Sequence, residues 1–503
     1  MDAKNGLSIT SDIFEGGSQT LVSLKENMST AIVWFRQDLR CHDNPALTLA
    51  CKNHEKLIPL YIKELKPVLA MGAAQQWWLH HSLLSLKHDL KKVNMELCLR
   101  EADPLELFKE LVSLYDVKTV YWNRCYEPMS IARDTLIKKE LKALGINVIS
   151  SNGSLLLEPW DVVTQSGSYF KVFTPYWRQC LRQIQVKPLE PIAQWPLNQP
   201  ASSARIEEWN LLPKHPNWAV EFSQHWQPGE DGAFIKLNHF LAEHLQGYKE
   251  LRNEPAISAT SRLSPHLHFG EISPHQIWMA MQQIMQDPDC DLLSAQSYLS
   301  ELGWREFSYH LLYHFPQLME ANFKGQFDSY PWLEDEQSLQ SWQQGLTGYP
   351  IIDAGMRELW RTGYMHNRVR MIVASFLTKD LMIDWRKGAA WFWDTLVDAD
   401  LASNSASWQW VAGSGADAAP YYRIFNPVLQ GEKFDPHGEY VKRWVPELMA
   451  VSSKWVHQPW KAPQGSLSIT LGVDYPLPIV DHALARQMAL LNYQQIKNKN
   501  TDL

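Results

Sequence analysis

The stretch Ala31–Leu47 reads AIVWFRQDLRCHDNPAL and sets the pattern for the first third of the chain. Five apolar residues predict a short buried strand, and a polar turn follows directly. The turn lacks the Gly-x-Gly-x-x-Gly sequence that brings a dinucleotide close to a helix N-terminus after the first strand of many α/β domains. We therefore do not expect a dinucleotide to be clamped in the usual way at this turn.

Four similar apolar runs follow, each separated from the next by a stretch of helical periodicity such as Trp77–Val93. The predicted strands are Ala31–Phe35, Leu57–Ile62, Met95–Arg100, Thr119–Trp122 and Asn147–Ser150. Strands that alternate with helices form βαβ units, in which the strands run parallel. The sequence thus predicts an α/β N-terminal domain with a doubly wound parallel sheet.

The remainder of the chain divides into a connector and a helical half. The connector is rich in Pro, Trp and Gln and has weak periodicity, as expected for a long linker that crosses the surfaces of its neighbours. After it the periodicity is helical almost to the end, which predicts an all-α domain. The assigned ranges are 1–29 (disordered tail or start-site artefact, with Met28 as an alternative start), 30–158 (α/β domain), 159–233 (linker), 234–492 (helical domain) and 493–503 (C-terminal tail).

The composition limits the possible functions. The 503 residues carry a formal net charge of −8, which argues against coating nucleic acid through bulk charge, so a DNA contact would need a local basic patch. No apolar run is long enough to predict a membrane span. The six cysteines are scattered without a Cys-x-x-Cys pair, which suits a reducing cytoplasm.

A basic cluster lies in the helical half. Four arginines fall within fourteen residues, interleaved with aromatic residues, Met and Asn: Arg357, Arg361, Arg368 and Arg370. A solvated helix surface is the simpler interpretation, but guanidinium groups beside aromatic faces also suit an unstacked base or a phosphate backbone. On a helix over residues 365–371, Asn367 and Met371 share one face. Arg370 is expected next to that face, whereas Arg368 is expected to point elsewhere.

The segment Thr260–Ser273, TSRLSPHLHFGEIS, places hydroxyl groups around Arg262 at the predicted start of a helix. Hydroxyls, free backbone N–H groups and an arginine at a helix N-terminus can hold a phosphate. Ser or Thr before a helix is also an ordinary cap. Taken alone, the segment leaves both interpretations open.

Several motifs occur in order across both halves: VWFRQDLRCHDNPAL, KVFTPYW, TSRLSPHLHFGEIS, ELGWREF, GYPIIDAGMRELWRTGYMHNRVRMIVASFLTKDLMIDWRKG and DADLASNSASWQWVAGSGADAAPYYRIFNPVLQGEKFD. Through them the chain resembles the photolyase/cryptochrome flavoproteins from about Ala31 to Val480, and most of all a class I cyclobutane pyrimidine dimer (CPD) photolyase. The resemblance implies an α/β antenna domain joined by a long linker to an all-α FAD-binding domain. It also implies a lyase that repairs UV-damaged DNA. In that mechanism excited, fully reduced FAD gives an electron to a flipped-out dimer, the ring splits, the electron returns, and no metal is needed.

The resemblance implies one FAD per chain, held in the helical half. The matching cofactor positions are Tyr248, Thr260, Ser261, Arg262, Leu263, Ser264, Arg370, Asp398, Ala399, Asp400 and Asn404. Asn404 matches the residue that faces flavin N5, where some signalling relatives have Asp, a proton donor. Asn at this position favours repair, and an exposed loop Asn is the alternative interpretation.

A second set of positions matches the family's contacts to DNA and to the dimer. These residues are Arg252, Glu301, Trp304, Arg305, Asn367, Arg368, Met371, Trp410 and Gln430. The resemblance assigns catalysis to Glu301, as a protonated donor to the anionic dimer, and to Met371, together with Asn404. Relatives that repair the (6-4) photoproduct carry a His-rich segment in place of HNRVRM, which makes that activity the less favoured alternative.

Three tryptophans match the family's electron relay from the surface to the flavin: Trp332, Trp385 and Trp408. For any one of them a packed core aromatic is the commoner role, but three matching positions favour the relay. Trp408 and Trp410 lie about 200° apart if SASWQW is helical, and on one face if it is a strand. A helix would direct Trp408 toward the flavin and Trp410 toward the lesion pocket.

The antenna chromophore stays open. Folate-binding relatives hold the pterin with a Glu in the α/β domain and a Cys-Lys pair, and here those places are Ser130 and Met319-Glu320. This argues against that folate site. It leaves a methenyltetrahydrofolate held differently, a deazaflavin, a second flavin or no antenna.

Two other functions remain as alternatives. One is a cryptochrome-like blue-light photoreceptor, which is less favoured because cryptochromes often add a long C-terminal extension. The other is an α/β nucleotide-binding enzyme with a purely structural helical half, which predicts a colourless protein. The favoured interpretation places a monomer in a bacterial-type cytoplasm, associated with the nucleoid through DNA and not with a membrane.

Overall fold

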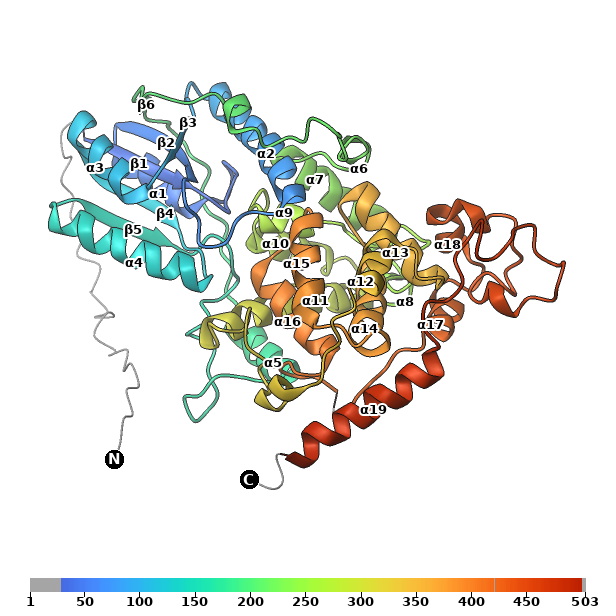
Figure 1. The fold of residues 1–503 in the computed structure, drawn as a ribbon. Coiled ribbons are helices and arrows are strands. Elements are labelled where there is room, and N and C mark those ends of the chain that lie inside the picture. The colour runs from blue at the N-terminus through green and yellow to red at the C-terminus, as the bar shows by residue number, and fades with distance from the viewer. Residues whose placement is uncertain (1–28, 420, 500–503) are drawn as a thin grey trace, which may run out of the picture.

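The computed structural model describes residues 29–419 and 421–499. They form an α/β domain and a larger helical domain, joined by an extended segment (Figure 1). The predicted N-terminal tail lies outside the described residues apart from Ser29, and so do residues 500–503 of the predicted C-terminal tail.

The α/β domain contains a six-stranded parallel sheet with the order β3-β2-β1-β4-β5, and β6 pairs with β2. The strands are β1 (Thr30–Phe35), β2 (Lys56–Glu64), β3 (Cys98–Ala102), β4 (Val117–Asn123), β5 (Asn147–Ser151) and β6 (Leu197–Asn198). All five predicted strands are confirmed, and the parallel sheet with them. The strand expected from Met95 begins only at Cys98.

Helices cover both faces of the sheet. They are α1 (Pro45–Asn53), α2 (Ala73–Lys92), α3 (Pro104–Tyr115) and α4 (Pro128–Ala143). Because side chains alternate along a strand, Ile32 and Trp34 of β1 pack in one cluster with α3 and α4. Val33 and Phe35 pack on the other face with α1 and α2. A sheet buried on both faces explains why its strands are almost continuously apolar.

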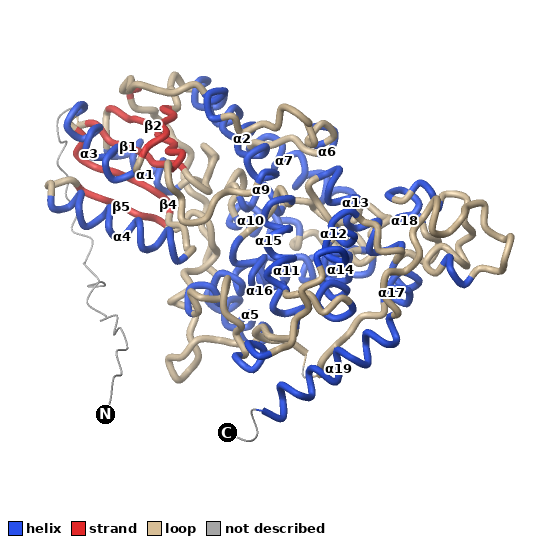
Figure 2. Tube along the Cα trace, in the orientation of Figure 1, coloured by secondary structure: helices blue, strands red, loops and turns tan. Residues whose placement is uncertain are grey.

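The predicted linker is mainly loop, drawn in tan in Figure 2, with short regular elements inside it. These are α5 (Phe173–Gln183), β6, a 3₁₀ turn (Ile206–Trp209) and α6 (Phe222–His225). The segment therefore adds a strand to the sheet of the first domain and a helix that packs against the second, since α5 contacts α11.

The helical domain surrounds α11 and α16. Its helices are α7 (Glu230–His239), α8 (Tyr248–Leu251), α9 (Ser264–His268), α10 (Pro274–Ile284), α11 (Leu292–His314), α12 (Glu336–Gln344), α13 (Pro350–Thr362), α14 (Asn367–Ser375), α15 (Trp385–Thr395), α16 (Leu401–Ala412), α17 (Pro427–Phe434), α18 (Glu439–Trp444) and α19 (His482–Lys499). Single π-helical turns follow α7 and α14. Two predicted boundaries fall inside helices, because α7 spans residues 233 and 234, and α19 continues through residue 493 to Lys499.

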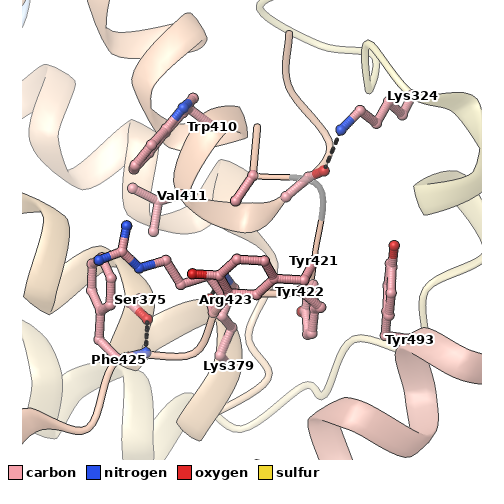
Figure 3. Close-up of a pocket in the computed structure, with 12 residues that line it drawn as sticks. Lys324, Ser375, Lys379, Trp410, Val411, Tyr421, Tyr422, Arg423, Phe425 and Tyr493 are labelled. Carbon is pink, nitrogen blue, oxygen red and sulfur yellow. Dashed lines mark hydrogen bonds between the residues drawn. The ribbon is translucent and has the colours of Figure 1, made fainter. Parts of the chain in front are cut away.

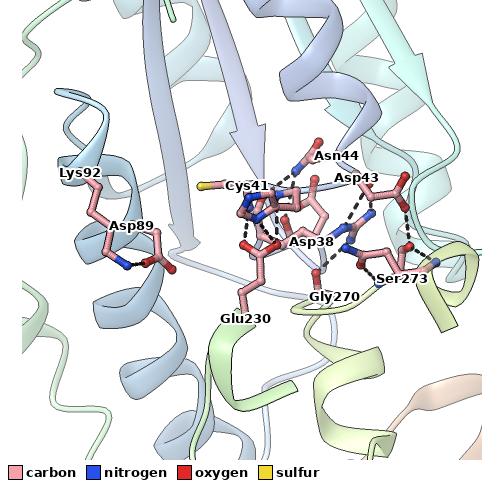
Figure 4. A network of polar contacts seen from close by, with 12 residues as sticks. Asp38, Cys41, Asp43, Asn44, Asp89, Lys92, Glu230, Gly270 and Ser273 are labelled. Carbon is pink, nitrogen blue, oxygen red and sulfur yellow. Dashed lines mark hydrogen bonds and ion pairs between the residues drawn. The ribbon is translucent and has the colours of Figure 1, made fainter. Parts of the chain in front are cut away.

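A buried polar network joins the two domains at the turn after β1 (Figure 4). The guanidinium group of Arg40, only 1% exposed, donates to the carbonyl oxygens of Asp43, Gly153 and Gly270 at 2.7, 2.8 and 2.9 Å. Glu230 of α7 accepts from the backbone N–H groups that follow Arg40. This turn, which sequence reasoning excluded as a dinucleotide clamp, instead binds the helical domain.

Candidate functional site

A cavity of about 490 Å³ opens between α11, α14, α16 and the turn before α16. Eleven of the residues predicted for cofactor or DNA contacts line it: Arg252, Ser264, Glu301, Trp304, Arg305, Asn367, Arg368, Arg370, Met371, Asp398 and Trp410. A smaller cavity of about 180 Å³ adjoins it, because Asn367, Arg370, Met371 and Asp398 line both. The smaller one adds Ala399, Asp400, Asn404 and Trp408. Segments more than 150 residues apart in the sequence thus meet at one site.

The other predicted residues lie outside these two linings. Tyr248 is buried against Phe240 and Tyr298, and Leu263 is buried in the same core cluster. Thr260 and Arg262 line a separate cavity. The structure does not place Ser261 or Gln430 on either of the two cavities, and Gln430 lies on α17.

Asp398 is the polar centre shared by both cavities. One of its oxygens, Oδ2, accepts from Ser264 Oγ at 2.5 Å and from Arg370 Nη2 at 2.8 Å. Burial lowers the pKa of Arg370, but the charge and hydrogen bond of Asp398, together with Tyr364 and Glu358, outweigh burial and leave that pKa above its ordinary value. The second oxygen, Oδ1, is buried and has no hydrogen-bond partner among the described residues. A residue that lines both cavities therefore keeps one buried acceptor without a donor among the described residues.

Asp400 begins α16 and is fixed by a second network. Its side chain accepts from the backbone N–H of Ser403, which makes it the N-cap of the helix. The hydroxyl of Tyr309 donates to its other oxygen. Burial acts to raise the pKa of Asp400, but His268, Arg305 and Tyr309 outweigh burial and hold that pKa below its ordinary value. The start of α16, and with it Asn404, is thereby held against α11.

Asn404 lies one turn into α16, and its Nδ2 donates to the carbonyl oxygen of Ala389 at 3.0 Å. It lines the smaller cavity beside Trp408, whose Nε1 is buried and has no partner among the described residues. The alternative of an exposed loop Asn is wrong, because Asn404 is helical and only partly exposed.

Glu301 and Arg252 form an ion pair at the mouth of the larger cavity. Arg252 Nη1 lies 2.6 Å from Glu301 Oε1 and also donates to Ser297 Oγ at 3.3 Å. An ion pair requires the ionised carboxylate, whereas the predicted donor role of Glu301 requires the protonated acid. The pair must therefore separate before Glu301 can act as a donor.

The expectation that Arg368 points away from the face shared by Asn367 and Met371 is wrong. Arg368 lines the cavity with Asn367 and Met371, and its Nη1 lies 3.6 Å from Met371 Sδ. Its Nη2 donates to Asn253 Oδ1 at 2.6 Å, so the long side chain turns sideways from its helix toward the segment after α8. Arg305 also lines the cavity, but its Nη1 donates to the carbonyl oxygen of Ser154 in the first domain.

The stretch around Trp408 and Trp410 is helical, as α16 runs from Leu401 to Ala412. Trp408 is 2% exposed and packs against Phe392 at a ring distance of 5.0 Å. Trp410 is more exposed, lines the larger cavity and donates from Nε1 to the carbonyl oxygen of Asp417. The helical prediction is confirmed, and the two rings line different cavities.

The two remaining relay candidates pack in the same hydrophobic cluster as Trp408. Trp385 is a core residue with 1% exposure, and its Nε1 donates to Asn322 Oδ1. Trp332 packs against the edge of the cluster and is partly exposed. Burial therefore decreases from Trp385 to Trp332, as a path that ends at the surface requires.

Sequence reasoning missed two contributions to the site. Phe173 of α5 stacks on Trp304 with ring centroids 3.8 Å apart and planes 10° apart, and it comes from the segment predicted as linker. Tyr364 lines the larger cavity and lies 5.0 Å from the guanidinium carbon of Arg370. The spacing of buried aromatics in α5 was available as a signal for the first, but nothing in the sequence pairs Tyr364 with the cavity.

A further small cavity of about 90 Å³ is lined by Trp410 and by residues of the loop after α16 (Figure 3). Lys324, Lys379 and Arg423 bring three basic side chains to it. Lys379 is 3% exposed and donates to the carbonyl oxygen of Arg423. Basic side chains therefore line this cavity, which shares Trp410 with the larger one.

No helix in the described part is long and apolar enough to cross a membrane. Within the same residues, no three His, Cys, Asp or Glu side chains gather where they could hold a metal ion.

Comparison with known proteins fits this geometry. Residues 31–196 match the family model of DNA photolyase, and residues 298–495 match that of the FAD binding domain of DNA photolyase. A deoxyribodipyrimidine photo-lyase of Agrobacterium fabrum is 49% identical over 93% of this chain and 98% of its own length. Cryptochrome-2 of Arabidopsis thaliana is 38% identical over 91% of this chain and 77% of its own.

Among solved structures, a class III photolyase from Agrobacterium tumefaciens superposes with a TM-score of 0.90 at 48% identity. The match covers 95% of this chain and 100% of that one, and so includes both domains. The chain belongs to the photolyase/cryptochrome family.

Proposed function

We propose that this protein is a deoxyribodipyrimidine photo-lyase, a light-dependent DNA repair enzyme that binds FAD and splits cyclobutane pyrimidine dimers. The observation that carries the proposal is the joint lining of the two adjoining cavities. Residues expected at the cofactor and residues expected at the dimer line the same walls, with Asp398 and Met371 common to both cavities. Such an arrangement suits direct electron transfer from a flavin to a neighbouring base.

The chain offers suitable partners for FAD. A flavin ring carries both hydrogen-bond donors and acceptors, and the site provides a buried acceptor at Asp398 Oδ1 and a buried donor at Trp408 Nε1, both without partners among the described residues. Asp398, Arg370, Asp400, Asn404 and Ser264 would hold the cofactor, supported by Tyr248, Ser261 and Leu263. Thr260 and Arg262 line a separate cavity instead. Fully reduced FAD, when bound and excited by light, supplies the electron that opens the dimer.

The residues around the larger cavity suit an extruded dinucleotide. Trp304 is 37% exposed and is backed by Phe173, and Trp410 is partly exposed. Both offer aromatic faces to the cavity, and Met371 on the same lining offers an apolar contact. Extruding a base costs a few kcal/mol and less for a lesion whose stacking is already damaged, so such walls favour the dimer over intact bases.

Arg252 and Arg368 stand at the mouth of the same cavity, where they can meet the phosphates of the DNA strand. A phosphate that takes the guanidinium group of Arg252 would release Glu301 from its ion pair. Glu301 would then face the dimer, which is where its donor role is needed. Asn367, Arg305 and Gln430 are proposed as weaker contacts to the DNA.

The subclass deserves revision. The motifs suggested class I, but the solved relative at 48% identity is titled a class III photolyase, and we propose class III on that basis. We further propose a monomer that works on DNA in a bacterial-type cytoplasm. The antenna stays open between a methenyltetrahydrofolate, a deazaflavin, a second flavin and none.

A cryptochrome-like photoreceptor is the second candidate, because a plant cryptochrome is 38% identical over 91% of the chain. Asn404 at the smaller cavity favours repair over that candidate, since an amide cannot donate a proton to a flavin as an Asp can. One experiment separates the two functions.

The chemically reduced holoprotein is mixed with UV-irradiated oligothymidine under blue light, and the return of thymine absorbance is followed. We expect recovery in the light and none in the dark. Trp304→Ala should slow recovery at low substrate concentration because it weakens dimer binding. The control is Trp360→Ala, at an exposed tryptophan of α13 that lines neither cavity, and it should match the wild type. No recovery by a protein that holds reduced FAD would refute repair and leave the photoreceptor.

A further inference from the structure

A separate cavity of about 460 Å³ lies behind the segment Thr260–Ser264, between α6, α13 and α18. It shares only Tyr364 with the cavity proposed for the dimer and has no residue in common with the smaller one. Its polar lining includes Arg262, Arg361, Arg443, His366 and Trp444. It is thus a distinct cavity, lined by a largely separate set of residues.

The cavity carries uncompensated positive charge. Arg361 is held by Glu221 through hydrogen bonds of 2.8 to 3.1 Å. Arg262 and Arg443 form no ion pair with any described residue. The remaining carboxylate, Glu358, is buried and accepts from Tyr440, and burial raises its pKa.

Three buried donors on this lining have no partner among the described residues: Arg262 Nε, His366 Nε2 and Trp444 Nε1. His366 is 95% buried, and its Nδ1 accepts from the backbone N–H of Arg368 at 3.2 Å. Burial and the neighbouring arginines lower the pKa of His366 to about 3, so the ring is neutral at physiological pH. With Nδ1 acting as acceptor, the single proton resides on Nε2, which is therefore a donor.

Arg443 gives the cavity a second cation that forms no ion pair with a described residue. It is exposed on α18, and its Nη2 donates to the carbonyl oxygen of Ala256 at 3.1 Å. The hydroxyl groups of Ser258 and Thr260 lie on the same lining. Guanidinium groups, hydroxyls and unpaired N–H donors around one hollow are the chemistry that binds a phosphate group.

We propose that this cavity binds a phosphate group, distinct from any phosphate of the cofactor, with Arg443 and Arg262 as its cations and Trp444 and His366 as neutral donors. The group could belong to the backbone of DNA that extends past the lesion or to a free phosphate compound. The first source rests on the proposed function, and the second does not.

The test uses the FAD-loaded full chain and three variants at consecutive residues of α18, Lys442, Arg443 and Trp444. Inorganic phosphate is added at constant ionic strength, with chloride as the balancing anion, and the unfolding temperature is followed. Wild type and Lys442→Gln should show the same phosphate-dependent rise, because Lys442 lies outside the cavity. Arg443→Gln should bind phosphate at least tenfold more weakly, and Trp444→Phe, which keeps the ring but removes the donor, several-fold more weakly.

Binding of dimer-containing duplex DNA then distinguishes the two sources. If a backbone phosphate occupies the cavity, Arg443→Gln should reduce the slope of log affinity against log salt by about 0.9 relative to Lys442→Gln. A normal slope with weakened phosphate binding assigns the site to a free phosphate compound. If Arg443→Gln matches the wild type in both measurements, the proposal is wrong. Dimer repair is measured in parallel, and its absence from the wild type would refute the proposed function without affecting the phosphate result.

Discussion

Replacing Lys379 with methionine should stabilise the protein at neutral pH, although it removes a hydrogen bond. Lys379 lies in the π-helical turn after α14, is 3% exposed, and places its ammonium group 4.7 Å from the ring centre of Tyr422. Burial lowers its pKa to about 7, while the charge of Asp380 opposes that change and Arg423 adds to it. Asp380 is itself paired with His482 of α19 at 2.5 Å.

The sign follows from proton binding. Between pH 7 and about 10.5, the folded protein holds Lys379 neutral while the unfolded chain still holds it charged, so unfolding takes up a proton. Proton uptake on unfolding makes the free energy of unfolding of the wild type rise with pH through that window. Below pH 7 the folded protein holds Lys379 charged, and the full cost of burying that charge applies. Across pH 7.5 to 9.5 the contribution amounts to about 2.5 kcal/mol, from about 1.4 kcal/mol for each pH unit and each proton.

Urea unfolding at pH 7.5, 8.5 and 9.5, followed by far-UV circular dichroism at fixed salt, measures the effect. The advantage of Lys379→Met over the wild type should be largest at pH 7.5 and should shrink by about 2.5 kcal/mol by pH 9.5. The lost hydrogen bond to Arg423 shifts all three values equally and does not alter this slope. Lys461→Met, at an exposed lysine, is the matched control and should show no such slope. A constant difference between Lys379→Met and wild type would refute the reasoning.

Three further predictions address the site. Trp385→Phe should abolish light-driven reduction of oxidised FAD, seen in the flavin absorbance, while chemically reduced enzyme still repairs dimers; equal photoreduction would remove Trp385 from the relay. Asp398→Asn leaves Arg370 without its buried charged partner, which costs about 3–5 kcal/mol of stability. The variant should therefore purify with less FAD per chain and unfold at a lower urea concentration. Unchanged values would contradict the Asp398 network. Arg368→Gln should reduce the log affinity against log salt slope for damaged duplex DNA by about 0.9, and an unchanged slope would exclude a phosphate contact.

The fold was largely predictable because apolar residues repeat differently in strands and in helices. Alternation of strands and helices identified the parallel sheet. The start of β3 was misplaced by three residues, and the other strand limits differ by at most two. Met95 and Leu97 are buried like strand residues without being in the strand, so burial alone cannot locate its first residue. β6 was not predicted because a strand of two residues is too short to show a pattern of apolar residues. In α5, by contrast, Phe173, Trp177 and Cys180 show helical spacing that the surrounding prolines obscured.

Within the site, contacts along one helix were predictable and contacts between segments were not. The shared face of Asn367 and Met371 follows from helical spacing and is confirmed by their common cavity. The course of Arg368 does not follow, because its partner Asn253 lies 115 residues away and a long side chain can reach sideways. The pairing of Arg252 with Glu301 likewise depends on how α8 packs against α11.

The network around Arg40 has an optical consequence. Its guanidinium group holds carbonyl oxygens from two segments of the first domain and from Gly270 of the second, so the domains are joined by directional bonds. Resonance energy transfer depends steeply on the separation of two chromophores and on the angle between their transition dipoles. For any light-harvesting pigment carried by the first domain, this junction would keep both quantities constant from one molecule to the next. A single transfer rate, measured as a single-exponential decay of the pigment's fluorescence, is the expected signature of such a pigment.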